Sequence, residues 1–97
     1  MDFTGKYCII RCKSAGVFAG VVQEVNGDEV VITGVRRLWY WSGAASLSQL
    51  AMEGVKNPGA CKFPVEVSTL LCKEWCEIIP CTEVAVKSIK SVPVWSA

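Results

Sequence analysis

Histidine is absent from this chain of 97 residues, and its absence removes the most common catalytic base. Without it neither a Ser-His nor a Cys-His dyad can form. The glycine-rich phosphate loop, the dinucleotide fingerprint G-x-G-x-x-G and the zinc motif H-E-x-x-H are missing too, so no cofactor is indicated. Glu74 and Glu77 lie close together, but two carboxylates among lysines are typical of a solvated surface. The sequence therefore predicts a protein without catalytic residues, one that binds rather than catalyses.

An excess of one charge sign and a long apolar run are also lacking. Ten Lys and Arg residues balance nine Asp and Glu residues. A protein that coats duplex nucleic acid normally carries a basic excess, so we expect no general nucleic-acid binding. No apolar run approaches the roughly 20 residues that a membrane helix needs. The first residues, MDFTGKYCII, lack the basic region of a signal peptide, so we expect a cytoplasmic protein without a membrane partner.

Cysteine, by contrast, is abundant. The six cysteines are Cys8, Cys12, Cys61, Cys72, Cys76 and Cys81. Most lie in apolar runs such as YCIIRC, where cysteine behaves as a small buried hydrophobe. We therefore predict six reduced, metal-free thiols. One alternative is a disulfide framework, as in small secreted chains. The other is a zinc site in which the pairs 8/12 and 72/76 converge, although structural zinc sites usually have C-x2-C or C-x4-C spacing.

The pattern of short alternating segments predicts strands along most of the chain. Residues 6–13, 17–27, 28–35, 61–67 and 76–80 are predicted strands, and residues 70–75 fit either a strand or a helical turn. Gly20 indicates a bulge or bend within its strand. The dipeptide Asn26-Gly27 indicates a hairpin, because both residues tolerate the positive φ of a type I′ turn.

Two short helices are indicated by their end signals. Ser46 to Gln49 fits a capping box, and Gly54 is a natural helix end. Thr82 can cap a second helix that ends before Pro93, and we expect Trp95 to fold back over the domain. With 52% apolar residues, the chain can form one core over residues 1–97. The predicted fold is a small α+β domain whose mainly antiparallel, twisted sheet is open or partly closed.

The segment RRLWYW combines charge and rings in a way that a simple core strand does not need. In an extended segment, Arg36 and Tyr40 face one side while Arg37, Trp39 and Trp41 face the other. An arginine can grip phosphate oxygens while a ring stacks on a base. The turn that follows leads to a helix start, where free N–H groups favour an anion. We therefore expect a ligand-binding wall, with no metal, formed by Arg36, Arg37, Trp39, Tyr40, Trp41, Ser42 and Gly43.

Two other interpretations of this segment stay open. The rings could be core residues with Arg37 stacked across one of them. An exposed cluster of Tyr, Trp and Arg is also typical of a protein–protein interface. Nine aromatic residues are a heavy apolar load for so small a domain, so we expect a homo-oligomer, most simply a dimer.

Several stretches of the chain resemble a family of small proteins encoded by tailed bacteriophages. They are YCIIRCKSAGVFAG, RRLWYWSGAASLSQLAMEGV, CKFPVEV, EIIPCTEVAVKSI and VPVW, and the most specific part runs from Arg36 to Gly54. The resemblance implies expression in a host bacterial cytoplasm and a role in host takeover or counter-defence. Two functions follow as expectations. The first is sequestration of a small phosphate-bearing, nucleotide-like molecule. The second is a protein-interaction module that inhibits a host protein or serves as a minor virion component.

Overall fold

The computed structural model describes residues 2–96, which form five strands and two α-helices. The strands are β1 (Tyr7–Cys12), β2 (Gly16–Asn26), β3 (Glu29–Arg37), β4 (Val67–Lys73) and β5 (Trp75–Pro80). The helices are α1 (Leu47–Glu53) and α2 (Glu83–Ser91), and a 3-10 turn covers Pro58–Ala60. The order of three strands, a helix, two strands and a helix matches the prediction, but the fourth strand lies at Val67–Lys73 and not at the predicted residues 61–67. None of the helices within residues 2–96 has the length and apolar character needed to cross a membrane.

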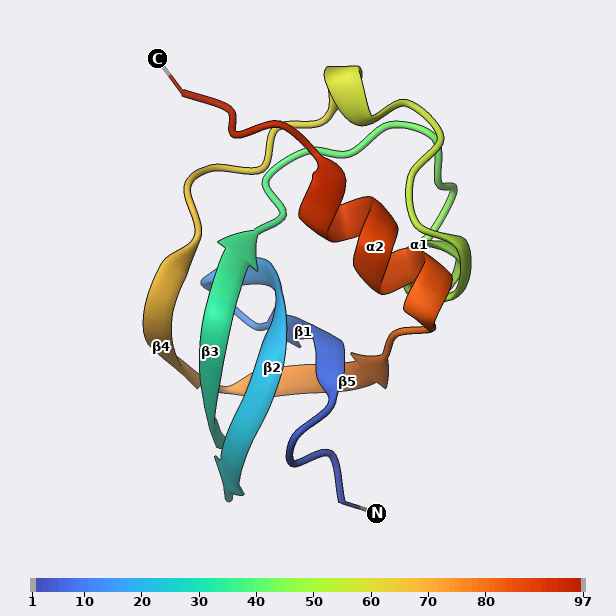
Figure 1. Cartoon of the computed structure of the whole chain (residues 1–97). Helices are drawn as coiled ribbons and strands as arrows, with labels where there is room; N and C mark the ends of the chain where they lie inside the picture. The colour runs from blue at the N-terminus through green and yellow to red at the C-terminus, as the bar shows by residue number, and fades with distance from the viewer. Residues whose placement is uncertain (1, 97) are drawn as a thin grey trace.

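The strands form one antiparallel sheet in the order β4-β3-β2-β1-β5 (Figure 1). The two edge strands, β4 and β5, are consecutive in the sequence and are separated by Glu74 alone. Glu74 has a left-handed φ of 58°, which turns the chain sharply from one edge of the sheet to the other. No ladder pairs β4 with β5, so the sheet is open and not closed into a barrel. The predicted α+β class is confirmed.

Gly20 lies at a bulge, as predicted, because the pairing of β2 with β3 shifts register between Ala19 and Val21. A Cβ atom at Gly20 would lie 2.7 Å from Ile32 Cγ2 and 2.8 Å from the Thr33 carbonyl oxygen. Only glycine lets the two backbones approach so closely at this point. The bulge bends β2 and so helps the sheet to curl.

The hairpin between β2 and β3 forms one residue later than the sequence predicts. Asn26 pairs with Glu29, so the two loop residues are Gly27 and Asp28. Of these, Gly27 has a left-handed φ, of 61°. Trp75 holds this loop from the far edge of the sheet: its ring N–H donates to the Gly27 carbonyl at 3.0 Å and its backbone N–H to the Asp28 carbonyl at 3.3 Å. The contacts of Trp75 therefore stabilise a turn at Gly27-Asp28, whereas the Asn26-Gly27 dipeptide alone predicts the turn one residue earlier.

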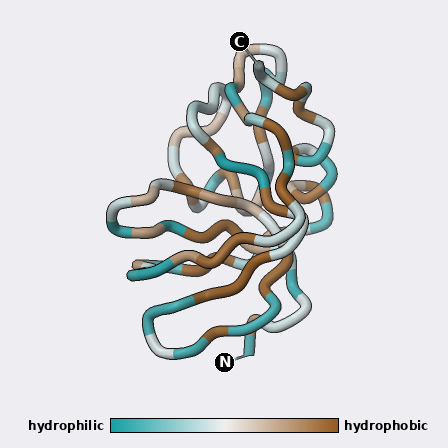
Figure 2. The backbone as a smooth tube through the Cα atoms, turned by 90° about the vertical axis from the view of Figure 1, so that its left-hand side faces the viewer, coloured by the Kyte–Doolittle hydropathy of each residue, from teal (hydrophilic) through white to brown (hydrophobic). Residues whose placement is uncertain are grey.

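Two clusters of buried side chains lie on opposite faces of the sheet. The helix-side cluster contains Ile9, Ala19, Leu38, Leu50, Ala51, Val55, Cys61, Phe63, Ile89 and Val92. The cluster on the opposite face, which we call the sheet-side cluster, contains Cys8, Ile10, Cys12, Phe18, Val22, Val30, Ile32, Val35 and Cys72. Hydrophobic stretches follow the strands while the hydrophilic residues gather at the turns (Figure 2). Successive residues of β1 thus alternate between the two clusters, as strand geometry requires.

Both helices have the predicted end signals. Ser46 caps α1 by accepting a hydrogen bond from the Gln49 N–H at 3.1 Å, while the Gln49 side chain accepts one from the Ala45 N–H at 2.8 Å. Gly54 ends α1 with a φ of 77°. Thr82 caps α2 by accepting from the Ala85 N–H at 3.1 Å.

The strand predicted over residues 61–67 is not formed. Within it the structure has two isolated bridges, Tyr40 with Lys62 and Phe63 with Val94. Pro64 lacks the N–H group that a ladder needs, and the segment crosses the end of the core instead of joining the sheet. The ambiguous residues 70–75 belong to β4 and to the start of β5.

The prediction of six reduced thiols is wrong for one pair, because a disulfide joins Cys12 to Cys72. Both side chains face the sheet-side cluster, and the curl of the sheet brings the end of β1 to β4. Cys8, Cys61, Cys76 and Cys81 are free. Within residues 2–96 no group of three or more Cys, His, Asp or Glu side chains is placed to hold a metal ion, so the four-thiolate alternative gains no support.

Candidate ligand-binding surface

The segment that follows β3 carries the predicted site residues. Arg37 is the last residue of β3, and beyond it the chain leaves the sheet. Leu38 is buried and its N–H donates to the Val17 carbonyl at 2.8 Å, whereas Trp39 and Tyr40 are 58% and 51% exposed. The regular alternation of buried and exposed side chains is therefore lost beyond Leu38, because the chain has left the sheet there. Two adjacent rings consequently reach solvent together.

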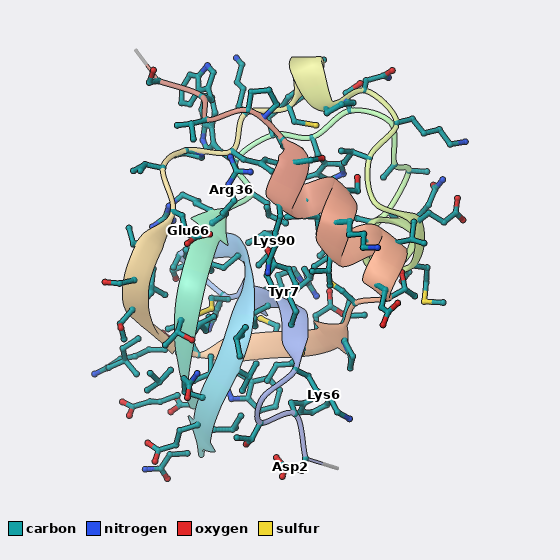
Figure 3. The ribbon with its side chains drawn as sticks, in the orientation of Figure 1. Asp2, Lys6, Tyr7, Arg36, Glu66 and Lys90 are labelled. Atoms are coloured by element: carbon teal, nitrogen blue, oxygen red, sulfur yellow. A yellow bond between two sulfur atoms is a disulfide. The ribbon has the colours of Figure 1, made fainter. Side chains whose placement is uncertain are left out.

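Arg36 does not belong to this surface, because its side chain is buried with 4% exposure. Its Nη1 donates to the carbonyls of Ile89 at 2.9 Å and Val92 at 2.7 Å, and its Nη2 donates to the carbonyl of Phe63 at 2.9 Å (Figure 3). Burial lowers the pKa of the guanidinium from its ordinary value, but an arginine keeps its charge in proteins. The proton donors of Arg36 are thus used inside the domain, which removes it from the predicted ligand wall.

Arg37 lies on the outside and remains a candidate. Its guanidinium carbon is 4.6 Å from the centre of the Phe18 ring, and Nη1 donates to the Ala15 carbonyl at 2.7 Å. A guanidinium carries five N–H donors, so this bond leaves capacity for an anion. A cavity of about 280 Å³ adjoins it, lined by Ala15, Gly16, Val17, Arg37, Leu38, Trp39 and Trp41. The structure therefore brings Arg37, Trp39 and Trp41 together, as the sequence predicts.

Trp39 also belongs to a cluster that we call the aromatic surface, formed by Trp39, Tyr40, Trp95 and Lys62. The Trp39 and Trp95 rings stack with centroids 5.0 Å apart and an angle of 20° between their planes. The Lys62 ammonium is 5.2 Å, 5.9 Å and 5.5 Å from the centroids of Trp39, Tyr40 and Trp95. The backbone N–H of Trp95 donates to the Phe63 carbonyl at 3.0 Å. Trp95 therefore folds back over the domain, as predicted.

Ser42 and Gly43 shape the loop and make no part of the aromatic surface. The Ser42 hydroxyl accepts from the Asn57 side-chain N–H at 3.2 Å. Gly43 has a φ of 93°, and a Cβ atom there would lie 2.5 Å from the Lys56 nitrogen. At the helix start after them, the Ser46 side chain accepts from the Gln49 N–H and the Gln49 side chain from the Ala45 N–H. Ser42 and Gly43 thus keep the loop after β3 packed against residues 56 and 57.

Lys62 and Trp95 extend the site beyond the residues that the sequence singles out. Both come from parts of the chain far from Trp39, and the bridges of residues 62 and 63 bring them there. The sequence signal for Lys62 is the local excess of positive charge between Arg36 and Phe63, which does not single out one lysine as part of a site. The two carboxylates near residue 75 form no site here, since Glu77 pairs with Arg11 at 3.0 Å across two neighbouring strands.

Comparison with known proteins gives a family and no closer relative. No curated protein and no solved structure matches the chain. A family model described as a domain of unknown function, DUF6948, matches residues 5–89. The matched span contains all five strands, Arg37, Trp39, Tyr40 and Lys62, and it ends within α2, before Trp95. The chain therefore belongs to the DUF6948 family.

Proposed function

We propose that this protein is a non-enzymatic binding domain for a small phosphate-bearing molecule with a flat ring, such as a nucleotide. The observation that carries this proposal is the exposed indole of Trp39, which has the Lys62 ammonium near it and shares a cavity with Arg37. A ring that stacks on an aromatic side chain gains about 1–3 kcal/mol. A cation beside the ring adds a charge-assisted contact for the phosphate.

The cavity between Arg37 and Trp39 is the expected place for the ligand ring. Its volume of about 280 Å³ lies just below the usual range of small-molecule pockets, roughly 300–1,000 Å³. A flat ring therefore fits beside Trp39 and Trp41, while the rest of the ligand stays at the surface near Arg37. Trp95 stacks on the Trp39 ring, which keeps the indole in position.

The resemblance of the chain to bacteriophage proteins gives the cellular context of this proposal. A phage accessory protein in the host bacterial cytoplasm would act in counter-defence by sequestering a nucleotide-like molecule. Exposed rings at the aromatic surface also favour a dimer, because closed two-fold dimers commonly cover such patches. Light scattering at micromolar concentration tests the dimer, and a monomer mass would contradict it.

A protein partner is the second candidate function, and one further observation favours it. Val65 and Val94 are 65% and 58% exposed and lie next to the bridge that seats Trp95. Val94 adds apolar area next to Trp95, and exposed Trp and Tyr residues are frequent anchors of protein interfaces. In this case the protein would inhibit a host protein or serve as a minor virion component.

The test is a fluorescence titration of the tryptophans with mono- and dinucleotides and with the matching nucleosides. We expect at least one nucleotide to bind, and its nucleoside to bind about tenfold more weakly because it lacks the phosphate. Arg37→Ala should weaken the nucleotide by about tenfold and leave the nucleoside unchanged. Arg11→Ala is the matched control, since that guanidinium pairs with Glu77 on another strand.

Two results would overturn the nucleotide proposal. One is the absence of binding for every nucleotide at millimolar concentration. The other is equal binding by the wild type and by Arg37→Ala, with both proteins showing the same melting temperature. If an affinity capture with the wild-type domain then retains a host protein that Trp39→Ala does not retain, the protein-interaction function takes its place.

A further inference from the structure

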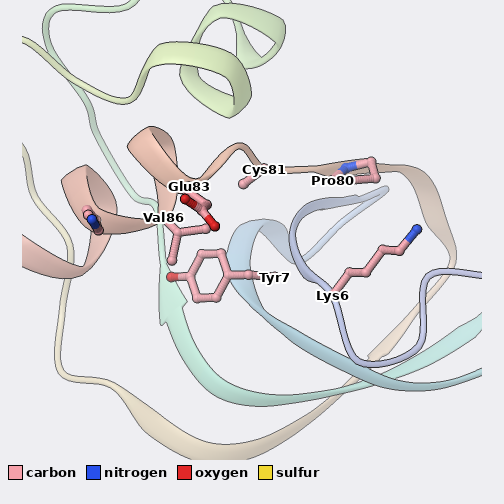
Figure 4. Close-up of a pocket in the computed structure, with 7 residues that line it drawn as sticks. Lys6, Tyr7, Pro80, Cys81, Glu83 and Val86 are labelled. Carbon is pink, nitrogen blue, oxygen red and sulfur yellow. The ribbon is translucent and has the colours of Figure 1, made fainter.

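A second cavity, of about 480 Å³, lies between the start of β1, the end of β5 and the first turns of α2 (Figure 4). Its lining residues are Lys6, Tyr7, Pro80, Cys81, Glu83, Val86 and Lys87. None of them belongs to the aromatic surface or to the cavity beside Arg37. Its volume falls within the range of small-molecule sites, roughly 300–1,000 Å³. The proposed function leaves this cavity unused.

The centre of this cavity is apolar. The Tyr7 ring lies close to Val86 and Glu83 in Figure 4, with Pro80 and Cys81 beyond them. Burial raises the pKa of the Cys81 thiol to about 12, so this side chain stays neutral at physiological pH. The pKa of Tyr7 is also raised by burial, and its phenol keeps its proton. A flat, apolar group can therefore lie between Tyr7 and Val86, against an uncharged thiol and an uncharged phenol.

The rim of the cavity is positively charged. Lys6 and Lys87 line it, and the Lys90 ammonium lies 5.3 Å from the centre of the Tyr7 ring. Among the lining residues, the two ammonium groups of Lys6 and Lys87 stand against the one carboxylate of Glu83, and Lys90 adds positive charge beside Tyr7. An anion is favoured over a cation at such a rim.

We propose that this cavity is a binding site for a small organic carboxylate with a flat apolar body. The apolar body lies against Tyr7 and Val86, and the carboxylate contacts the ammonium of Lys87 or Lys6 at the rim. Such a ligand buries its ring in the largely apolar cavity and keeps its charge where water and lysine reach it. A small polar anion without an apolar body gains little here, because solvent-exposed ammonium groups alone bind anions weakly.

The test compares 2-naphthoate with 2-naphthamide, two probes that share a ring system and differ in charge. Amide chemical shifts of the nitrogen-15-labelled full chain report where each probe binds. We expect 2-naphthoate to shift the amides of Tyr7, Cys81 and Val86, and 2-naphthamide to bind the same place about three- to tenfold more weakly. Lys87→Ala should remove most of that difference, while Lys13→Ala, at an exposed position between β1 and β2, should leave it intact.

A second variant tests the cavity itself. Val86→Phe places a ring in the cavity and should abolish the binding of both probes, while an unchanged amide spectrum elsewhere shows that the domain is folded. The proposal is overturned if millimolar 2-naphthoate shifts none of the three amides, or if its shifts are confined to residues near Trp39 and Trp95. Equal affinity of the two probes also overturns it, because the site would then not select an anion.

Discussion

Arg36 and Arg37 are adjacent in the sequence but lie in opposite environments. Successive side chains of a strand point to opposite faces, so one guanidinium enters the helix side of the domain and the other stays outside. Arg36 donates to carbonyls at the end of α2 and to the Phe63 carbonyl, and it thereby ties α2 to the segment that carries Lys62. Arg37 makes one backbone hydrogen bond and lies on the Phe18 ring. One arginine is structural and the other is available.

Replacement of Arg36 should destabilise the domain. Arg36→Met keeps much of the side-chain length but loses several charge-assisted hydrogen bonds and leaves carbonyls unpaired, which should cost about 3 kcal/mol. Arg36→Lys should lie in between, because one ammonium cannot reproduce the planar fork. Urea denaturation gives the free energy of unfolding, and Arg37→Ala serves as the control with an expected loss below about 1 kcal/mol. A loss below that of Arg37→Ala would contradict the assigned role.

At the scale of the elements, the Thr82 side chain makes one of the contacts between the two helices. Its hydroxyl accepts from the Ala85 N–H at 3.1 Å and donates to the Met52 carbonyl at 2.7 Å. The same side chain thus caps the start of α2 and binds the last turn of α1. Ser46 performs the capping part of this role for α1.

Removal of the two caps should therefore have unequal effects. Thr82→Ala should lower the free energy of unfolding by about 2 kcal/mol, because it loses a cap and a contact between helices. Ser46→Ala should lower it by about 1 kcal/mol, the usual effect of losing a cap alone. Thermal unfolding followed by circular dichroism compares the two variants with the wild type. Equal losses would mean that the bond to Met52 contributes nothing.

At the scale of the whole molecule, the disulfide connects the inner strand β1 to the edge strand β4 across the curled sheet. Cys12 ends β1, and Cys72 lies near the end of β4, at a sequence separation of 60 residues. Thiol titration of the denatured protein without reductant should count four thiols, and the count should rise to six after reduction. Six thiols before reduction would show that the two sulfurs are neighbours without a bond.

Stability should also decrease at alkaline pH through two thiols, the buried Cys8 and the half-buried Cys81. Burial raises the pKa of Cys8 to about 11 and that of Cys81 to about 12, whereas thiols of the unfolded chain ionise near 8.5. The unfolded state loses these protons first, so the stabilisation is complete below about pH 8 and is lost progressively as the pH rises toward 11–12. Each thiol contributes a slope on the order of 1 kcal/mol per pH unit between these limits.

Urea denaturation of the wild type and of the variant Cys8→Ala/Cys81→Ala, across the range from about pH 8 to pH 10, measures this effect. Lysines and tyrosines titrate in both proteins, so the difference between the two curves belongs to the thiols. The variant should show a smaller loss of stability with rising pH than the wild type. Parallel curves would show that the thiols do not ionise differently in the two states.

The amino-acid sequence by itself determined the local features of this protein. The capping signals of Ser46 and Thr82, the helix end at Gly54 and the bulge at Gly20 depend on residues that are near one another in the chain, and each is present in the structure. The alternation of β1 likewise follows from strand geometry and is independent of distant residues. The order of the strands and helices could therefore be predicted.

Tertiary structure alone decided which residues that are distant in the sequence come into contact. The pairing of Cys12 with Cys72, the burial of Arg36 and the arrival of Lys62 and Trp95 beside Trp39 all depend on segments that the chain brings together from a distance. Periodicity gives two faces to a strand but does not say which face the rest of the chain covers. The way the rest of the chain covers this segment decides that Trp39 and Arg37 are accessible. A side chain can bind a ligand only where the fold leaves it exposed.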